Sequence, residues 1–422
     1  LNPNYKSDEY EFYLNDLKPK IVLVEPNSTN SVVDVAKKLK IPVCEIKIKK
    51  NHPTGFFDLF NKENNFNEPN ENDEALVLHT SGTTSRPKIV PLTNKNIYSS
   101  SLNISKSLSL SEKDHCLNIM PLFHIHGLIA IIASSMKSGA SVCASSGFNA
   151  LKFLELAKSE KITWYSGVPT MHQTIMLRAE KNLELAKNLN LRLVRSSSAS
   201  LPPAVFEKLN KVFNCPVIEA YGMTEATHQM TSNPLPPKKQ KAGFVGIPAG
   251  PEVFIMNDNN QIMKNGEIGE ICIKGNNVTS GYENNPEANE SSFNNGWFRT
   301  GDQGFFDQDG YLKISGRLKE IINKGGEKIS PLEIDNVLMD HPSIEQAVCF
   351  GYEVKMLGED IATAIIVKEG MNCTEEDLKN YANEKLAKFK VPKKIFFVNE
   401  IPKGATGKLQ RNTLAKKFGL VN

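Results

Sequence analysis

Short apolar runs alternate with amphipathic stretches over the first half of the chain, from Lys20 to about Gly222. The runs have the length and composition of strands, and they are Ile21–Val24, Ala75–His79, Cys116–Met120, Ser141–Ala144, Ile162–Ser166, Leu191–Ser196 and Val217–Tyr221. Helix-like segments lie between them, for example Ala150–Glu160 and Pro203–Phe213, where the proline suits a first helical turn. Alternating strands and helices predict an α/β fold, with a largely parallel sheet and helices on both of its faces.

The second half of the chain has a different character. From Glu252 to Gly275 the pattern becomes β-rich, with glycine and asparagine at the turns. A smaller α+β portion follows, and its expected elements are a hairpin at Tyr311–Ser315, a helix near Leu332–Met339, strands at Ala347–Phe350 and Thr363–Val367, and a helix at Glu375–Leu386. We place the boundary at Gly316–Lys319, so that residues 1–316 form a large multi-subdomain α/β domain and residues 317–422 a small, mobile α+β domain.

The charge balance excludes several classes of protein. The 422 residues include 50 Lys and Arg against 47 Asp and Glu, a net charge of +3, which argues against a histone-like protein, an acidic tail or a polybasic membrane adaptor. The longest apolar runs, such as Gly127–Ser134, fall far short of the roughly 20 residues that cross a bilayer. We therefore expect no membrane span.

Three further features bear on compartment and partners. The seven cysteines are scattered without a Cys-x-x-Cys pair, which fits free thiols in a reducing compartment. The segment from Lys385 to the end carries ten Lys and Arg and one acid, Glu400, but its aromatic residues are not interleaved as stacking platforms for bases, so we expect a solvated basic face and no nucleic-acid partner. The chain ends Leu-Val-Asn422 and not S-K-L, which favours the cytoplasm, with the peroxisome as the alternative.

One short segment carries the clearest chemical signal. Leu78-His-Thr-Ser-Gly-Thr-Thr-Ser-Arg-Pro-Lys88 follows an apolar strand and precedes a helix expected near Thr93. Its hydroxyl groups, glycine and two cations cannot build a core, whereas they suit a nest of N–H, O–H and positive charge around phosphate oxygens. The G-x-x-x-x-G-K-[ST] pattern is absent, so this is no Walker loop. Read alone, the segment is also compatible with a Ser- and Thr-rich surface turn.

The loop resembles the phosphate loop of the acyl-adenylate-forming (AMP-binding) superfamily, which includes acyl-CoA synthetases, firefly luciferase and the adenylation domains of peptide synthetases. Six more segments match in the family's order: Pro121-Leu-Phe-His-Ile-His-Gly127, Tyr221-Gly-Met-Thr-Glu225, Thr300-Gly-Asp302, Gly316-Arg-Leu-Lys-Glu320, Gly325-Gly-Glu-Lys328 and Pro402-Lys-Gly-Ala-Thr-Gly-Lys408. Within the superfamily, the chain is most similar to oxalate–CoA ligases in the amino-acid sequences of His79–Lys88, Arg195–Leu201 and Met223–His228.

The resemblance implies an enzyme that activates a carboxylic acid with ATP and then transfers it to CoA. In the first step the carboxylate attacks the α-phosphorus and pyrophosphate leaves, so cations and Mg²⁺ must gather around the phosphate oxygens. The family's pattern implies that the nucleotide is bound by Thr80, Ser81, Gly82, Thr83, Thr84, Lys88, Ser200, Glu219, Ala220, Tyr221, Thr224, Asp302 and Arg317.

Individual roles follow from the same resemblance. Thr224 would bond the α-phosphate, and Glu225 would hold Mg²⁺, whose coordination shell phosphate oxygens and water complete. Tyr221 would stack on adenine, while Asp302 and Arg317 would bind the ribose hydroxyls. Without the other motifs, Asp302 is equally compatible with a residue that forms a turn between strands, and Glu225 with a residue that caps the helix after it.

Lys408 would bridge the carboxylate and the α-phosphate in the first half-reaction, although alone it reads as a solvated lysine. In the second, the resemblance implies that the small domain rotates about a hinge at Lys319 and withdraws the Lys408 loop. Gly325, Gly326 and Lys328 would then meet CoA, whose thiol displaces AMP. Domain rotation lets one chain build two closed sites, and paired glycines permit close backbone approach.

Ser198 and His228 are the candidates for the acid pocket. Ser198 stands where many fatty-acid and aromatic-acid relatives carry glycine, and His228 closely follows the Thr-Glu pair. A hydroxyl and an imidazole together suit the far carboxylate of a dicarboxylic acid, whereas burying that charge unpaired would cost several kcal/mol. We expect oxalate as the substrate. Medium-chain fatty acids and 4-coumarate are the alternatives, and a lone buried histidine is often only a core residue.

His124 lies, by the resemblance, along the acyl pocket, and we expect it to contact the substrate as a catalytic residue. On a strand, His124 and His126 would share one face, as zinc ligands can, but no carboxylate or cysteine cluster supports zinc.

The chain departs from the family in two respects. Only 79 residues precede Thr80, whereas family members usually have well over a hundred, so we expect that an N-terminal piece is missing. Ile89 replaces the glycine that usually follows the phosphate-loop lysine. A non-catalytic nucleotide-binding remnant is therefore the alternative of another class.

Overall fold

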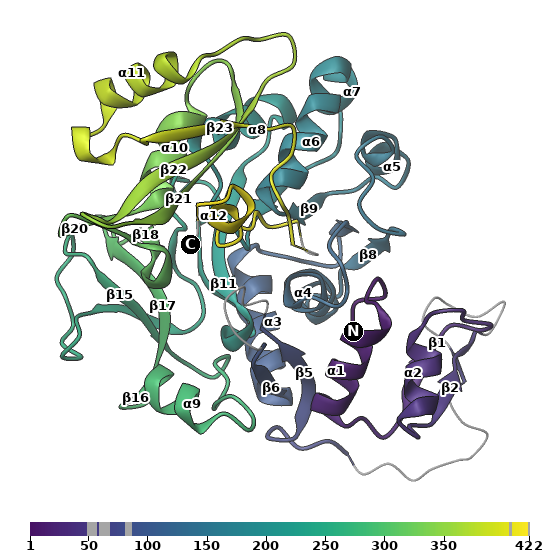
Figure 1. Cartoon of the computed structure of the whole chain (residues 1–422). Coiled ribbons are helices and arrows are strands. Elements are labelled where there is room, and N and C mark those ends of the chain that lie inside the picture. Colours follow the sequence, from purple (N-terminus) through teal and green to yellow (C-terminus); the bar gives the residue numbers. More distant parts are fainter. Residues whose placement is uncertain (49–56, 59–67, 81–86, 405–406, 421–422) are drawn as a thin grey trace. The chain divides into compact units, whose positions relative to one another are not determined.

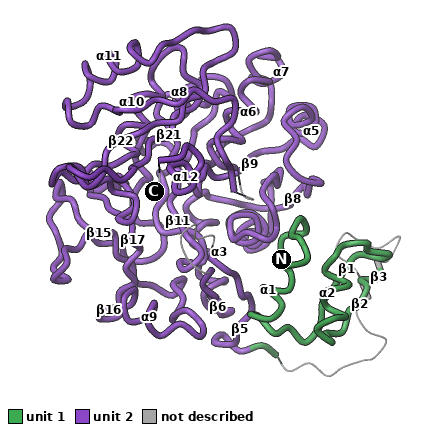
Figure 2. Tube along the Cα trace, in the orientation of Figure 1, with its two compact units in different colours: residues 1–69 green, residues 70–422 purple. Residues whose placement is uncertain are grey.

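The computed structural model describes residues 1–48, 57–58, 68–80, 87–404 and 407–420. Four predicted phosphate ligands, Ser81, Gly82, Thr83 and Thr84, and most of the Asn-rich stretch that follows Asn61 lie outside the described residues. The chain divides into two compact units, residues 1–69 and 70–422 (Figure 2). The predicted boundary at 316/317 is a different division and stays a prediction.

The first unit is built on two helices and a short parallel sheet. Helix α1 spans Ser7–Leu17 and α2 spans Val32–Lys38, while strand β1 (Val22–Val24) pairs with β2 (Val43–Glu45). Strands β3 (Lys47–Ile48) and β4 (Phe57–Asp58) form a separate pair. Tyr10, Leu14, Val24, Val35 and Ala36 are among the residues that form the core of this unit. The predicted strand Ile21–Val24 therefore belongs to this small sheet and not to the main one.

The second unit contains the expected parallel sheet. Its strand order is β13-β12-β11-β10-β9-β7-β8, and the five strands β8, β7, β9, β10 and β11 are parallel. The strands are β7 (His115–Asn118), β8 (Ser141–Ala144), β9 (Trp164–Gly167), β10 (Leu193–Ser196), β11 (Val217–Met223), β12 (His228–Ser232) and β13 (Ile247–Pro248). The predicted α/β class is confirmed.

Helices cover both faces of this sheet, as Figure 1 shows. One face packs on α5 (Phe153–Ser159), α6 (Pro169–Ala179), α7 (Leu183–Lys187) and α8 (Pro203–Phe213), and the other on α3 (Asn94–Ser107), the π-helix η1 (His126–Ala133) and α4 (Ser134–Lys137). Successive strand residues alternate between the two cores, since Trp164 joins one and Tyr165 the other. A sheet buried on both faces favours apolar residues at successive positions, which explains its near-continuous apolar runs.

The predicted phosphate loop connects two antiparallel strands. Strand β5 (Glu74–His79) pairs with β6 (Ile89–Thr93) in a two-stranded sheet. The expectation that Ala75–His79 joins the parallel sheet is therefore wrong, whereas the helix expected near Thr93 is confirmed, since α3 begins at Asn94. Strand β6 intervenes, and α3 begins after it, with the Thr93 side chain accepting a hydrogen bond from the backbone N–H of Asn96.

Two antiparallel or mixed sheets complete the unit. The first contains β14 (Glu252–Met256), β15 (Gly269–Lys274), β16 (Phe293–Asn294), β17 (Trp297–Phe306) and β18 (Leu312–Arg317), with α9 (Pro286–Ser292). The 3₁₀ turn η4 (Leu318–Glu320) leads to the second, which contains β19 (Ile322–Lys324), β20 (Glu327–Ile329), β21 (Ile344–Val354), β22 (Gly358–Val367) and β23 (Lys394–Phe397), with α10 (Pro331–Met339), α11 (Glu375–Lys385) and the terminal α12 (Leu414–Lys417). The predicted β-rich portion corresponds to the first sheet. That sheet also contains, as β18, the hairpin strand that was expected at Tyr311–Ser315 in the α+β portion, and the rest of that portion corresponds to the second sheet.

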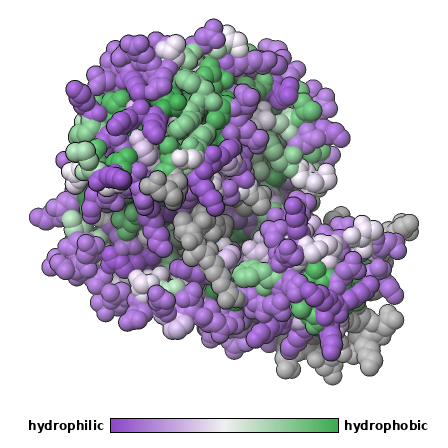
Figure 3. Space-filling model, viewed as in Figure 1, coloured by the Kyte–Doolittle hydropathy of each residue, from purple (hydrophilic) through white to green (hydrophobic). Residues whose placement is uncertain are grey.

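The molecular face in Figure 3 is mostly hydrophilic, with hydrophobic side chains visible in its upper part. Single apolar side chains are also exposed, such as Met356 at 96%. No helix among the described residues is long and apolar enough to cross a membrane.

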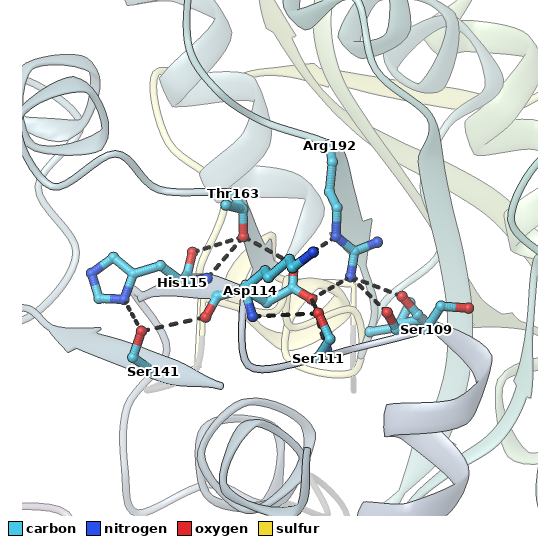
Figure 4. A network of polar contacts seen from close by, with 9 residues as sticks. Ser109, Ser111, Asp114, His115, Ser141, Thr163 and Arg192 are labelled. Atoms are coloured by element: carbon cyan, nitrogen blue, oxygen red, sulfur yellow. Dashed lines mark hydrogen bonds and ion pairs between the residues drawn. The ribbon is translucent and has the colours of Figure 1, made fainter. Parts of the chain in front are cut away.

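A buried ion pair ties the parallel sheet to helix α3 (Figure 4). Asp114 is 4% exposed, and its carboxylate accepts hydrogen bonds from Nε of Arg192 at 2.6 Å, from the Thr163 hydroxyl at 3.1 Å and from the Ser111 backbone N–H at 2.9 Å. Arg192 also donates to the carbonyl of Leu108, just beyond the C-terminus of α3, at 2.9 Å. Burial raises the pKa of Asp114, but these hydrogen bonds outweigh it and leave the pKa below its usual value.

Replacing Asp114 with alanine is expected to lower the free energy of unfolding by about 3 kcal/mol, because it leaves a cation without its partner. We expect the low end of the range for a broken buried pair, since the Arg192 side chain is 34% exposed. Urea unfolding followed by tryptophan fluorescence measures the loss. Glu180→Ala removes an exposed ion pair with Lys208 and should cost under about 1 kcal/mol. Equal losses of unfolding free energy in the two variants would contradict the assignment of Asp114 and Arg192 as a buried ion pair.

Candidate active site

Several predicted site residues lie at or near the carboxyl ends of the parallel strands. Ser198 follows β10 and Tyr221 lies near the end of β11. Ser166, which the sequence did not predict, lies one residue before the end of β9. In open α/β sheets this edge is where ligands bind. The strand order, and not sequence proximity, therefore brings these side chains together.

His126 is the centre of a polar cluster at this edge. Its Nδ1 lies 3.0 Å from the Ser198 hydroxyl and its Nε2 lies 2.6 Å from the Ser166 hydroxyl. The ring of His228 lies 5.0 Å from the ring of His126, measured between centroids. The structure therefore brings the predicted pair, Ser198 and His228, to one place. The histidine that bonds Ser198 is, however, His126, which the sequence did not predict as a substrate residue.

His228 is a buried polar side chain without a partner. It is 1% exposed, and neither ring nitrogen has a hydrogen-bond partner among the described residues. Burial is the main cause that lowers the pKa of both His126 and His228 well below the usual value, so both rings are neutral near pH 7. A neutral imidazole keeps one N–H to donate. Leaving that donor buried and unpaired is costly, which indicates that a ligand completes it.

The backbone at the two predicted acid-pocket residues is strained. Ser198 has φ +72° and His228 has φ +91°, both in the left-handed region that non-glycine residues rarely adopt. A Cβ atom on Gly222 would lie 1.7 Å from the carbonyl oxygen of His228, so only glycine fits opposite that histidine. Strain of this kind gathers at functional sites, where the surrounding structure holds it.

His124 lies beside this cluster, but it does not lie on a strand with His126, as the zinc-site alternative required. Residues 121–125 form a turn into η1, so His124 and His126 do not share a strand face. Nδ1 of His124 instead accepts the backbone N–H of His126 at 3.2 Å. Burial, with Lys408 nearby, lowers the pKa of His124 to about 3. No group of three or more metal-ligating side chains occurs among the described residues.

Asp302 joins the two other residues predicted to bind the nucleoside. The hydroxyl of Tyr221 donates to Oδ2 of Asp302 at 2.6 Å, and Nε of Arg317 donates to Oδ1 at 2.8 Å. Asp302 is 5% exposed and lies within strand β17, which rules out the turn-former reading. Its negative charge raises the pKa of Arg317 above the usual value.

Glu225 and Lys88 meet at Tyr282. Oε1 of Glu225 accepts the Tyr282 hydroxyl at 2.8 Å, so that carboxylate oxygen does not cap a helix. Nζ of Lys88 lies 4.3 Å from the centroid of the Tyr282 ring. Burial lowers the pKa of Lys88, while the charge of Glu225 opposes that effect. Thr80 closes the base of the loop, since its hydroxyl accepts the Lys88 backbone N–H at 3.1 Å. Tyr282 is a site residue that the sequence did not predict.

Lys408 lies at the same site. Its loop is docked by the Thr170 hydroxyl, which donates to the carbonyl of Gly407 at 3.0 Å. Burial, followed by the charge of Arg317, lowers the pKa of Lys408 to about 8, while Asp302 and Glu225 oppose the decrease. The predicted catalytic lysine is therefore electrostatically coupled to the residues predicted to hold the nucleotide and Mg²⁺.

The remaining predicted residues are spread over several elements. Among the nucleotide residues, Glu219 is buried, accepts the Leu201 backbone N–H at 2.9 Å and has a pKa raised to about 8 by burial. Gly325 and Gly326 form the turn between β19 and β20 with φ +59° and +91°, a conformation that suits glycine. The others are Thr224 at the start of the 3₁₀ turn 224–226, Ala220 within β11, half-buried Ser200, and Lys319 and Lys328, which are exposed. Their roles stay predictions.

Comparisons with known proteins find relatives that cover nearly the whole chain. The family model "AMP-binding enzyme" matches residues 1–283, and "AMP-binding enzyme C-terminal domain" matches residues 333–408. Oxalate–CoA ligases from Saccharomyces cerevisiae and Arabidopsis thaliana are 42% and 45% identical to the chain, over 99% of it and 81% and 83% of their own lengths. The structure of o-succinylbenzoate CoA synthetase from Bacillus subtilis in complex with ATP and magnesium matches with a TM-score of 0.82 and 29% identity, covering 98% of this chain and 83% of that one.

Proposed function

The chain belongs to the AMP-binding enzyme family, and we propose that it is an AMP-forming acid–CoA ligase that converts oxalate, ATP and CoA into oxalyl-CoA, AMP and diphosphate. Its co-substrates are ATP and CoA, and Mg²⁺ is the metal. Medium-chain fatty acids and 4-coumarate are the alternative acids, and they differ from oxalate in lacking a second carboxylate beside the first.

The observation that carries the choice of oxalate is the unpartnered His228 ring beside the Ser198–His126 pair. A second carboxylate would accept hydrogen bonds from these donors, and bonds to a charged acceptor are worth more than neutral ones. An aliphatic or aromatic tail would leave the same donors buried and unsatisfied. The names of the two relatives at 42% and 45% identity support the same choice.

In the proposed first half-reaction, one carboxylate oxygen of oxalate attacks the α-phosphorus of ATP and diphosphate leaves. The ammonium group of Lys408 holds the attacking carboxylate against the α-phosphate, and Lys88 binds the outer phosphates. Tyr221, Asp302 and Arg317 hold the nucleoside. Because developing charge on phosphate oxygens must be neutralised in place, a preorganised cation is the chain's main contribution.

The residues present fit a magnesium ion. Glu225 is 7% exposed and supplies a hard oxygen ligand, of which Tyr282 occupies only Oε1 among the described residues. Mg²⁺ is usually bound by one or two carboxylates, together with substrate phosphates and water. When bound, the ion supplies positive charge to the phosphate oxygens.

In the proposed second half-reaction, the thiolate of CoA attacks the activated carbonyl and AMP leaves. This step requires that Lys408 withdraw and that another face of residues 317–422 approach. We propose that Lys319 is the hinge and that Gly325, Gly326 and Lys328 approach CoA. The two family models support a hinge in this region, because they match separately on either side of residues 284–332.

Ser198→Ala and His228→Ala are each expected to raise the KM for oxalate by about 10- to 100-fold, the effect of losing a hydrogen bond to a charged group. The KM for ATP should stay within about twofold, because neither residue is proposed to touch the nucleotide. Steady-state AMP formation with purified protein measures both constants. Unchanged oxalate kinetics in both variants would overturn the proposed pocket.

Adenylate formation by the free enzyme is expected to decline as pH rises through about 8. Lys408 acts as a cation, and its pKa is lowered to about 8, so the active form is complete below that pH and is lost above it. The decline should appear in kcat/KM for ATP. Lys408→Arg keeps its charge throughout and should retain its lower activity up to pH 9. The same decline in that variant would show that another group titrates.

A further inference from the structure

A guanidinium lies behind the acid pocket without an acid to neutralise it. Arg195 on β10 is 0% exposed, and it donates to the Ser166 hydroxyl at 3.3 Å and to the side-chain carbonyl of Gln229 at 3.1 Å. Its Nε has no partner, and no carboxylate pairs with it in the part of the chain that the structure describes. Arg192, three residues earlier, has Asp114 as its counter-ion. Arg195 is therefore not held as half of an ion pair.

Keeping Arg195 buried is expensive for stability. Burial lowers its pKa to about 9, so the group remains mostly charged near pH 7. A buried cation without a counter-ion costs several kcal/mol. An aliphatic side chain would avoid this cost, which points to a use of the charge at the neighbouring site.

The hydrogen bonds around Arg195 have a fixed direction. A guanidinium only donates, so Ser166 and Gln229 must accept from it. Gln229 then turns its amide N–H groups outward, to the Ser107 hydroxyl and to the Ala249 carbonyl, both at 3.0 Å. Every polar atom of the Gln229 side chain is thereby used, so this residue fixes the orientation of Arg195.

The partners of Ser166 determine which nitrogen of His126 carries the proton. Among the described residues, the Ser166 hydroxyl has Arg195 as donor and His126 as its other partner. The Ser166 hydroxyl is buried and Arg195 cannot accept, so Nε2 of His126 is the acceptor available to its single proton, and Ser166 donates to Nε2. The neutral ring then carries its own proton on Nδ1 and donates it to the Ser198 hydroxyl, 3.0 Å away. The proton of Ser198 is left free to donate to a ligand.

We propose that Arg195 is a positioning residue that orients a relay from Ser166 through His126 to Ser198, so that the pocket presents a hydroxyl proton to an anionic group of the acid. The inference rests on the proposed function, because it assigns the relay to recognition of the second carboxylate. The uncompensated charge adds to this selection, since it favours a dianion over a monocarboxylate. In the opposite tautomer, Ser198 would donate to His126 and present only lone pairs to the acid.

The tautomer of His126 tests the relay without any substrate. Protein labelled with ¹⁵N at histidine and studied by long-range ¹H–¹⁵N correlation should place the His126 proton on Nδ1, with His126→Gln identifying the signal. In Arg195→Gln, whose side-chain oxygen can accept the Ser166 proton, a substantial fraction of the His126 proton should move to Nε2. A proton on Nε2 in the unaltered protein, or one that stays on Nδ1 in Arg195→Gln, overturns the proposal. The measurement on the unaltered protein keeps the test available if Arg195→Gln fails to fold.

Kinetics provide the second arm. Arg195→Gln is expected to raise the KM for oxalate by about 10- to 100-fold while kcat and the KM for ATP change by less than about threefold. The matched control is Arg192→Gln, which removes a cation from the same stretch of chain but should leave the KM for oxalate unchanged. An equal rise in both arginine variants would reveal a general structural effect. If another acid proves to be the substrate, the tautomer result still decides the relay separately.

Discussion

Replacing Lys408 with alanine is expected to slow adenylate formation by about 10²- to 10³-fold, the loss typical of removing one preorganised stabilising group. The structure places this lysine at the site through the hydrogen bond from Thr170 to Gly407, and its pKa responds to Arg317, Asp302 and Glu225. Thioester formation from preformed oxalyl adenylate should change little, since the proposed domain rotation withdraws Lys408 before that step. Oxalate-dependent exchange of labelled diphosphate into ATP measures the first step, and a single turnover with the adenylate measures the second.

The control for Lys408 is a lysine of the same loop. Lys403 is exposed, and Lys403→Ala should leave both half-reactions unchanged. A Lys408→Ala variant that keeps its exchange rate within about threefold of the unaltered protein would contradict the proposed role. An equal loss in both half-reactions would show that the substitution damages the fold or a shared site.

Replacing Glu225 with glutamine is expected to lower the rate of adenylate formation by about 10²-fold and to raise the Mg²⁺ concentration that is needed for half-maximal rate. Glutamine keeps the shape of the side chain and an oxygen that accepts the Tyr282 hydroxyl, so the main change is the lost negative charge. Titration of the exchange rate with Mg²⁺ at saturating ATP separates metal binding from catalysis.

Tyr282→Phe is the matched control for Glu225→Gln. It removes the hydrogen bond to Glu225 but keeps the aromatic ring beneath Nζ of Lys88. Losing one hydrogen bond of this kind should slow the reaction by less than about tenfold and leave the Mg²⁺ titration close to that of the unaltered protein. An unchanged Mg²⁺ requirement in Glu225→Gln would refute the assignment of this carboxylate to the metal.

Local signals in the sequence predicted much of the fold. Helix Pro203–Phe213 and strand Ser141–Ala144 have the same bounds in the sequence analysis and in the structure. The sequence marks the ends of both elements, because a proline stands in the first turn of the helix and the strand coincides with a short apolar run. Strand β6 was not predicted, because Pro91 at its centre lacks the N–H that a paired strand normally uses. Its pairing with β5 depends on a partner ten or more residues away, which periodicity does not reveal.

The candidate site was predictable only in part. Composition alone indicated a phosphate loop, while Asp302, Arg317 and Lys408 entered through the family resemblance. The partnership of Tyr221 with Asp302 joins residues 81 positions apart, which no local pattern reveals. His126 and His124 illustrate the same limit: a strand would present both to one side, but the turn into η1 separates them. The sequence pattern placed Arg195 in an apolar strand, and only the folded structure shows that none of the described acidic residues pairs with it.

The most direct test of the central claim is CoA-dependent AMP formation by the purified chain with oxalate, malonate, hexanoate and coumarate as competing acids. The account predicts that oxalate gives both AMP and the thioester, with kcat/KM at least about tenfold above each of the other acids, since the buried donors match its second carboxylate. A preference for hexanoate or coumarate would contradict the proposed pocket while keeping the ligase chemistry. No AMP with any acid, despite measurable ATP binding, would contradict the ligase assignment itself.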